Sequence, residues 1–171
     1  VMLRTRSSVK ENPYLAYSSL SLENVASKMS YPWIKVAEVL FCRAEGALRG
    51  WNMGGTAQEF YEAGIRRGFS DIGEVGKYFS YKEKTSVKDV DYVDYFDQDN
   101  NIEGRVNVGV KWDESDDKEL KLEKIITQKW IALMGTNGIE NWIEYKRTGF
   151  PAVPVAPGET SIPVRLLYPE A

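Results

Sequence analysis

The chain has 171 residues, of which 43% are hydrophobic and 27% charged, a composition typical of one soluble globular domain. Its formal net charge of -3 argues against a general binder of the nucleic-acid backbone, which needs a positive surface. Histidine, the commonest general base and metal ligand, is absent, and a single cysteine allows neither an internal disulfide nor a cysteine-built zinc site.

The chain begins with a polar, serine-rich stretch, residues 1–30, which predicts an extended lead-in. This stretch lacks the features of a signal peptide, and the last residues follow a proline-rich stretch without a capping element. Because no apolar run is long enough to span a membrane, we expect a soluble piece of a longer protein. The Tyr31-Pro32 pair favours a helix boundary, since the residue before proline is pushed out of the helical region. Apolar residues then recur at helical spacing over residues 33–49, which predicts the first helix.

A second helix is predicted for residues 57–69, because Thr56 and Glu59 form the pattern of a capping box at its start. Gly64 lies in the middle of this helix, where glycine costs about 1 kcal/mol, and it therefore indicates a close contact with another helix. Two helices joined by a tight turn form a helical hairpin, the unit of tetratricopeptide-like repeats. One such hairpin is evident, at residues 33–69.

Residues 71–118 are rich in glycine, aspartate, tyrosine and lysine and predict a long loop, which in a compact domain is usually functional or mobile. Within it we expect a short helix at residues 75–81 and a strand at residues 105–110, where apolar and polar residues alternate. A pair of helices is predicted for residues 118–147. Prolines then force an irregular tail over residues 148–171.

Two glutamates, Glu38 and Glu45, lie on one stripe of the first helix, roughly 10 Å apart along its axis. An inverting glycosidase holds its two carboxylates about 6.5–9.5 Å apart across a cleft, so this pair makes a poor catalytic site. Structural ion pairs are the favoured interpretation, with Arg49 as the partner of Glu45 and a later helix supplying the partner of Glu38. Lys129 lies within an apolar stripe, so it should either snorkel to solvent or meet a carboxylate.

Residues 97–101 resemble the opening of a calcium loop, but Ile102 and Val108 stand where an EF-hand needs glycine and glutamate. A solvated acidic loop is the favoured interpretation, and a calcium site of another kind is the alternative. No glycine-rich phosphate motif follows Gly54-Gly55. Cys42 lies in the middle of a helix in a chain without histidine, so we expect a buried, inert thiol.

Several aromatic residues lie at turns or in the polar loop instead of on core stripes: Trp51, Trp112, Tyr78, Tyr81, Tyr92 and Tyr95. Such rings beside Asp and Asn suit a sugar site, because a ring stacks on a pyranose while carboxylates and amides bind its hydroxyls. A satellite core beneath the loop is the alternative. The candidates for ligand contact are Trp51, Trp112, Tyr92 and Tyr95. The tryptophans expected in the core are Trp33, Trp130 and Trp142.

Four segments of the chain, taken together, resemble the SusD/RagB family of outer-membrane lipoproteins and follow the family's order. They are YP at 31–32 with AEVLF at 37–41 and AEGA at 44–47; AQEFYEAGIR at 57–66; ITQKWIAL at 126–133 with GIENW at 138–142 and KRTGFP at 146–151; and IPVRLLYP at 162–169. The third segment is the most specific.

The resemblance implies a mainly α fold of tetratricopeptide-like helical hairpins with long irregular loops, in which residues 1–171 are the C-terminal part of a single SusD-like domain. It implies a non-catalytic lipoprotein at the surface of a Bacteroidetes-type bacterium, which binds a glycan or another nutrient. Its implied partners are an oligo- or polysaccharide, a SusC-like TonB-dependent transporter and the rest of the parent chain. No cofactor, metal or nucleic acid is implied, and membrane contact would come from a lipid anchor outside this chain.

Two alternatives remain open: a glycoside-active enzyme that uses acidic residues of the 89–119 loop, and a purely structural interaction scaffold. Within the resemblance, we expect a structural charge network that ties the helical hairpin to the later helices. Its members are Glu38, Glu45, Lys129, Glu140 and Arg147. The matching motifs belong to the scaffold, and they identify the family without locating its ligand.

Overall fold

A computed structural model describes residues 32–86, 91–94 and 97–155 of the chain. The helices in these ranges are α3 (Val36–Leu48), α4 (Ala57–Asp71), α5 (Val75–Tyr81), α6 (Lys118–Leu133) and α7 (Gly138–Thr148), with a short 3-10 turn, η2 (Gln98–Asn100). The described residues contain no strand, and their one β-bridge joins Tyr92 to Ile102. The fold is therefore mainly helical, as predicted.

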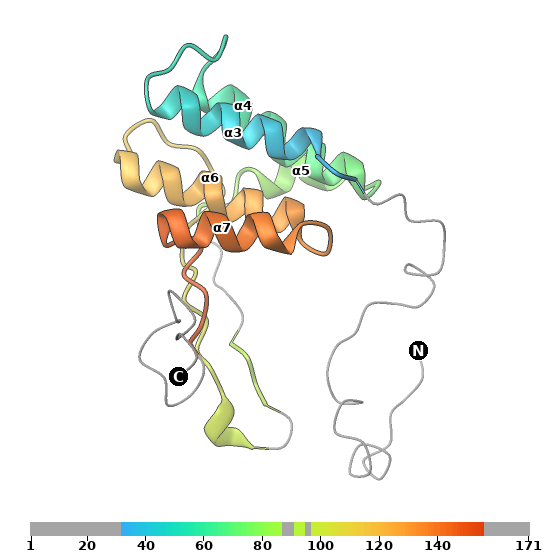
Figure 1. Ribbon diagram of the computed structural model, residues 1–171, viewed down its shortest axis with the longest axis vertical. Helices are drawn as coiled ribbons and strands as arrows, with labels where there is room; N and C mark the ends of the chain where they lie inside the picture. Colours follow the sequence, from blue (N-terminus) through green and yellow to red (C-terminus); the bar gives the residue numbers. More distant parts are fainter. Residues whose placement is uncertain (1–31, 87–90, 95–96, 156–171) are drawn as a thin grey trace, which may run out of the picture.

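The helices form a compact bundle. One extended segment, the arm (residues 91–94 and 97–104), projects from it. α3 packs against α4 and α6, while α5 contacts α4 and α7 contacts α6. Figure 1 shows α3 and α4 side by side above α6 and α7, with the segment around η2 reaching away below them. The predicted lead-in over residues 1–30 and the end of the predicted tail, residues 156–171, lie outside the described part of the chain.

The helical hairpin is closely packed where Gly64 of α4 meets Phe41 of α3. A Cβ atom added at Gly64 would lie 2.8 Å from Phe41 Cζ, which is closer than real contacts allow. Both residues are buried, and the ring of Phe41 stands edge-on to that of Tyr61 with their centroids 6.4 Å apart. The glycine in the middle of the helix thus has the packing role that its position predicts.

The starts of three helices are fixed by side-chain caps. Thr56 Oγ1 accepts a hydrogen bond from the backbone N–H of Glu59 at 3.2 Å, and Glu59 Oε2 accepts one from the backbone N–H of Thr56 at 2.8 Å. This reciprocal pair confirms the predicted capping box. Asp117 caps α6 and Asn137 caps α7 by accepting backbone hydrogen bonds in the same way.

The strand predicted at residues 105–110 is wrong, although the alternation behind it is real. The segment is extended but has no partner strand among the described residues. Its backbone is held instead by the N–H groups of Val110 and Lys111, which donate to Lys84 O, and by Tyr61 Oη, which donates to Val110 O at 2.7 Å. Every second side chain enters the core: Val108, Val110 and Trp112.

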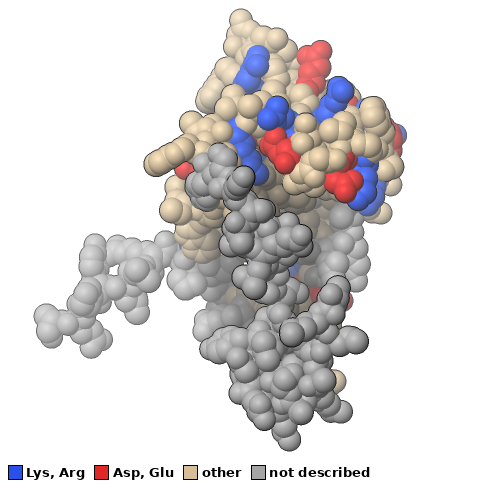
Figure 2. Space-filling model, turned by 90° about the vertical axis from the view of Figure 1, so that its right-hand side faces the viewer, with Lys and Arg blue, Asp and Glu red and all other residues tan. Residues whose placement is uncertain are grey.

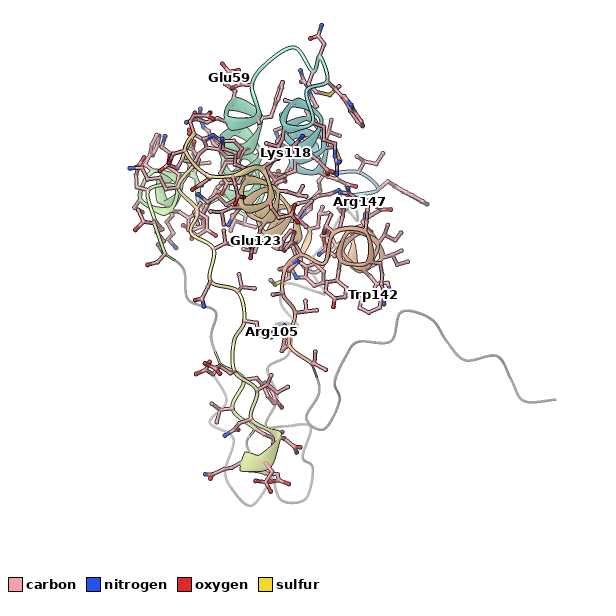
Figure 3. All side chains as sticks on the ribbon, turned by 90° about the vertical axis from the view of Figure 1, so that its left-hand side faces the viewer. Glu59, Arg105, Lys118, Glu123, Trp142 and Arg147 are labelled. Carbon is pink, nitrogen blue, oxygen red and sulfur yellow. The ribbon has the colours of Figure 1, made fainter. Side chains whose placement is uncertain are left out.

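The expectation of a core position is wrong for two of the three helical tryptophans. Trp33 is 92% exposed because α3 begins only at Val36, so Trp33 precedes the helix instead of lying on its inner face. Trp142 is 43% exposed, since it lies on the side of α7 that points away from α6, as Figure 3 shows. Trp130 is half-buried.

Candidate binding site

The described residues form a hollow of about 440 Å³ where the α3–α4 turn meets the start of α6. Figure 3 faces this end of the bundle, where Glu59 and Lys118 mark the first turns of α4 and α6. The side chains that matter for its chemistry are Leu48, Trp51, Thr56, Trp112, Glu114 and Lys121. Two of the four predicted ligand residues, Trp51 and Trp112, therefore line one site.

Trp51 presents its indole to solvent from the turn that follows α3. Its side chain is 63% exposed. The turn folds back on the helix, since the backbone N–H of Trp51 donates to Gly46 O at 2.9 Å. A Cβ atom at Gly46 would lie 2.8 Å from Met53 Sδ and 3.4 Å from Trp51 Cε3, so the glycine makes room for the turn. The ring is thus held in place by the backbone while its surface stays open.

Trp112 forms an inner wall of the hollow, and it is not the exposed platform that its place in the loop predicts. It is only 8% exposed, and its ring lies 5.2 Å from that of Tyr61. Its indole N–H donates to Glu114 Oε1 at 2.9 Å. Because the extended segment turns this side chain into the core, Trp112 can shape the hollow and orient Glu114, and it offers little surface for stacking.

Glu114 and Lys121 form an ion pair at the edge of the hollow. Lys121 Nζ donates to Glu114 Oε2 at 3.0 Å and to the backbone oxygen of Glu114 at 2.8 Å. The indole N–H of Trp112 and the ammonium of Lys121 hold the pKa of Glu114 below its ordinary value. Glu114 is therefore a carboxylate at neutral pH, and its side chain is 72% exposed, whereas that of Lys121 is 12% exposed.

These groups combine an exposed ring with a charged acceptor and a charged donor. A flat aromatic surface binds the apolar face of a sugar ring, while the carboxylate and the ammonium bind hydroxyls at its edge. Pockets for small ligands likewise use a few placed polar groups to fix the orientation of the ligand. The arrangement is suited to binding a carbohydrate.

The other two candidate ligand residues belong to a different part of the molecule or lie outside its description. Tyr92 is on the arm, where it pairs with Ile102 and its hydroxyl donates to Asp94 Oδ2 at 3.0 Å. Figures 1 and 3 both show this arm at the opposite end from the α3–α4 turn. Tyr95 lies outside the described residues. The structure therefore does not join Tyr92 to the hollow.

The acidic side chains of the arm hold its own turns. Asp94 Oδ1 accepts from the backbone N–H of Asp97 at 2.9 Å, and Asp97 Oδ1 accepts from that of Asp99 at 3.0 Å. Asp91 Oδ1 accepts from the backbone N–H of Gly104 at 2.9 Å. In the part of the chain that the structure describes, no three His, Cys, Asp or Glu residues are grouped so that they could hold a metal ion.

A second polar cluster links α3, α6 and α7. Arg147 donates two hydrogen bonds to the carboxylate of Glu45, each at 2.6 Å, and Figure 3 shows Arg147 between α7 and α3. Arg147 also bonds to Glu144, whose Oε1 accepts from Lys129 Nζ at 2.7 Å. Lys129 is only 3% exposed, so this cluster is largely closed to solvent at its centre.

The pKa shifts in this cluster reflect its pairing. Burial alone would raise the pKa of Glu45, but the hydrogen bonds from Arg147 and Arg49 outweigh it, and the pKa lies below its ordinary value. Burial alone would lower the pKa of Lys129, but its contacts with Glu144 and Cys42 raise it. Glu45 and Lys129 are therefore both charged at neutral pH.

The expected charge network and the observed one overlap in part. Glu45, Lys129 and Arg147 are brought together, with Arg49 on Glu45 as predicted. The residue that joins them is Glu144, which the sequence analysis missed. No signal in the sequence separates Glu144 from Glu140, since the two are one helical turn apart on α7.

Two of the five expected members, Glu38 and Glu140, are not part of the observed network. Glu38 does not pair with a later helix as expected, since its Oε2 is buried without a hydrogen-bond partner. Glu140 forms no ion pair with any described residue, and its backbone N–H donates to Asn137 Oδ1 at 3.4 Å. The expectation of a buried thiol is also wrong, because Cys42 is exposed, with its Sγ 3.5 Å from Lys129 Nζ.

On the face that Figure 2 presents, basic and acidic side chains are interspersed over the described helices. No helix in the described ranges is long and apolar enough to cross a membrane.

Comparisons with known proteins place this chain beside a group of outer-membrane proteins. The sequence profile of the family described as SusD-like, Susd and RagB outer membrane lipoprotein, matches residues 1–162. Among curated proteins, no sequence matches the chain.

Solved structures give closer relatives. A chitin-binding SusD homologue from Flavobacterium johnsoniae is 51% identical, with a TM-score of 0.62, and the match covers 68% of this chain and 24% of that one. A SusD homologue from Bacteroides thetaiotaomicron is 44% identical, with a TM-score of 0.63, over 71% of this chain and 25% of that one. A SusD-like protein from the same species is 38% identical, with a TM-score of 0.64, over 71% and 25%. The chain thus spans about a quarter of the length of these relatives.

Proposed function

Because the chain belongs to the SusD-like family of outer-membrane lipoproteins, we propose that it is part of a nutrient-binding protein of the outer membrane and that its hollow at Trp51 binds a glycan. The observation that carries this proposal is the exposed indole of Trp51 beside the Glu114–Lys121 ion pair. Support comes from a relative at 51% identity that is described as chitin-binding.

The proposal extends to the setting of the whole protein. It is a non-catalytic lipoprotein, exposed at the cell surface, that passes its glycan to a SusC-like TonB-dependent transporter. The acidic residues of the arm support a binding role over a catalytic one, because three of their carboxylates accept hydrogen bonds from the arm's own backbone. A hydrolytic site needs a pair of carboxylates free to reach the substrate.

Affinity electrophoresis of the full-length protein against a panel of polysaccharides tests this function. We expect retardation by at least one glycan and no release of reducing ends. Trp51→Ala should weaken the affinity about tenfold, since stacking on one ring contributes roughly 0.5–1.5 kcal/mol beyond its buried area.

Tyr92→Ala is the matched control, because it removes a partly exposed ring from the arm and leaves the hollow intact. Its affinity should equal that of the wild type. Loss of binding in Tyr92→Ala but not in Trp51→Ala would move the site to the arm. Release of reducing ends would replace the binding function with that of a glycoside-active enzyme.

A further inference from the structure

The end of the bundle opposite the hollow contains a second cavity, of about 200 Å³. It lies where the start of α3 meets the ends of α4 and α6. In Figure 1 the start of α3 and the end of α6 are on the right, the side that Figure 2 turns to the viewer. The wall of the cavity is largely aliphatic and aromatic, and it includes Ile65, Phe69, Ile72, Ile131, Ala132 and Met134.

The polar side chains of this cavity are bonded within the protein. Lys35 Nζ donates to Ala132 O at 2.9 Å, and Tyr81 Oη donates to Gln128 Oε1 at 3.2 Å. With these groups paired and the rest of its wall apolar, the cavity suits an apolar group better than a sugar. An apolar cavity of about 150 Å³ holds a benzene ring, so this one has room for one apolar side chain.

Exposed apolar side chains surround the cavity. Three of the residues that line it are themselves exposed, Ile72 by 69%, Met134 by 66% and Ile131 by 45%. The chain on either side of Lys35, which also lines the cavity, adds three more. A single exposed apolar residue is normal, but a group of them around a cavity marks an interaction surface. This apolar end face consists of Trp33, Ile34, Val36, Ile72, Ile131 and Met134.

The length of the relatives indicates what covers this face. A helical hairpin of the tetratricopeptide-like kind does not bury its apolar surfaces alone, and neighbouring hairpins of the same chain cover them. In the described ranges the α3–α4 hairpin packs on α6, and the apolar end face stays exposed. Because this chain spans about a quarter of the length of its SusD-like relatives, a protein of their length has further polypeptide that can pack there.

We infer that the apolar end face is an internal interface of the full-length protein, covered by a helix of the same polypeptide that lies outside these 171 residues. One aliphatic or aromatic side chain of that helix fills the cavity, and its apolar neighbours contact Ile72, Met134 and Trp33. The hollow at Trp51, at the opposite end of α3, stays open to its ligand. This inference concerns a different surface from the proposed glycan site and does not depend on it.

Thiol labelling of the full-length protein, purified without any transporter, tests this inference. Cys42, which is exposed, and any other cysteine are first replaced by alanine. Ile72→Cys and Met134→Cys then each place one thiol on the apolar end face, and Trp51→Cys places one at the hollow as the control. We expect the first two thiols to react at least about tenfold more slowly than in the denatured protein, because a packed helix must open before the reagent enters. The control thiol should react at close to the denatured rate.

Two outcomes of the labelling would overturn the inference. Rates at positions 72 and 134 close to those of the denatured protein would show a free surface, and protection that appears only after a transporter is added would assign the face to that partner. Protection that disappears on dilution, together with a dimer in sedimentation, would assign it to a second copy of the protein.

A charge placed on the same face gives a second measurement. Ile72→Asp should lower the midpoint of thermal unfolding of the full-length protein by several degrees, because it buries an unpaired carboxylate under the covering helix. Ser70→Asp is the matched control, since Ser70 is exposed and lies two residues earlier, on the opposite side of the helix, and it should leave the midpoint unchanged. Equal midpoints for the two variants would contradict the inference.

Discussion

Two lysines of α6 form ion pairs in opposite surroundings. Lys129 pairs with Glu144 at 2.7 Å, and the two side chains are only 4% and 13% exposed. Lys121 pairs with Glu114 at 3.0 Å, and the carboxylate is 72% exposed. The first pair joins two neighbouring helices, α6 and α7, whereas the second joins α6 to the loop just before it.

The difference between the two pairs lies in what surrounds the carboxylate. Glu144 is shared between Lys129 and Arg147, and Arg147 continues to Glu45, so the network closes on protein groups from three helices. Glu114 instead lines the hollow, its side chain is 72% exposed, and its partners Trp112 and Lys121 are both close to it in the sequence. The same residue types therefore serve two ends: a closed pair fixes the orientation of helices, and an open pair is available to a ligand.

The largest effect that separates the two pairs should come from removing their carboxylates. Glu144→Ala leaves the buried ammonium of Lys129 without its carboxylate, which should cost about 3–5 kcal/mol of unfolding free energy. Glu114→Ala breaks an exposed pair and should change the stability little, because solvent screens such a pair. Urea denaturation measures both, and equal losses would break the distinction between a closed and an open pair.

Lys129→Met sharpens the same test. It removes the buried charge and keeps a side chain of similar length, while Glu144 retains Arg147 as its partner. We therefore expect a smaller loss than in Glu144→Ala, because an unpaired buried charge costs more than an absent one. A larger loss in Lys129→Met would contradict this expectation, because it would mean that the paired ammonium stabilises the protein by more than an unpaired one costs.

Both polar sites depend on α3, whose position against α4 rests on Gly64. Gly64→Ala should cost about 1–3 kcal/mol, because the new methyl group would lie 2.8 Å from the buried ring of Phe41. Gly68→Ala, one turn along the same helix, is the matched control. Its methyl group would lie 3.5 Å from Ala132 Cβ, an ordinary contact, so the better helix former should stabilise the protein by up to about 1 kcal/mol. Urea denaturation should show changes of opposite sign in the free energy of unfolding of the two variants. Changes of the same sign would mean that Phe41 moves aside.

Local rules explain why the helices could be predicted. The capping box at Thr56 depends only on Glu59, three positions away, and it appears as expected. The predicted helix at residues 75–81 is α5, and the helix predicted to begin at residue 118 begins there. Hydrophobic periodicity is sufficient for such elements because one face of each helix is buried.

Contacts between elements explain what could not be predicted. The alternation before Trp112 is correct, but it cannot tell a strand from an extended segment packed on helices. Trp142 has helical spacing with its neighbours, yet α7 packs along α6 alone among the described helices and reaches α3 through Arg147, so its outer side stays exposed. The choice of Glu144 over Glu140 depends on the rotation of α7 about its axis. In the candidate site, Trp51 and Trp112 were predicted from the sequence, but Glu114 and Lys121 were not.

The smallest expected effect concerns the pH dependence of the closed network. The pKa of Glu45 in the folded protein lies below its ordinary value of 4.5, so its pairs with Arg147 and Arg49 stabilise the protein above that pH. This stability is lost as the pH falls through the lowered pKa, where the carboxylate becomes protonated. Glu45→Gln should therefore cost about 1 kcal/mol at pH 7, and the difference from the wild type should shrink toward zero between pH 4.5 and acid conditions.

Urea denaturation of the wild type and Glu45→Gln at a series of pH values measures this change, with Glu114→Gln as the counterpart from the open pair. Glu114 also has a lowered pKa, but its side chain is largely in water, so its replacement should change the stability little at any pH. A difference for Glu45→Gln that stays constant across the series would mean that Glu45 acts through packing and not through its charge. The closed network would then owe its strength to Glu144 alone, because that carboxylate would be the one remaining charged partner of both Lys129 and Arg147.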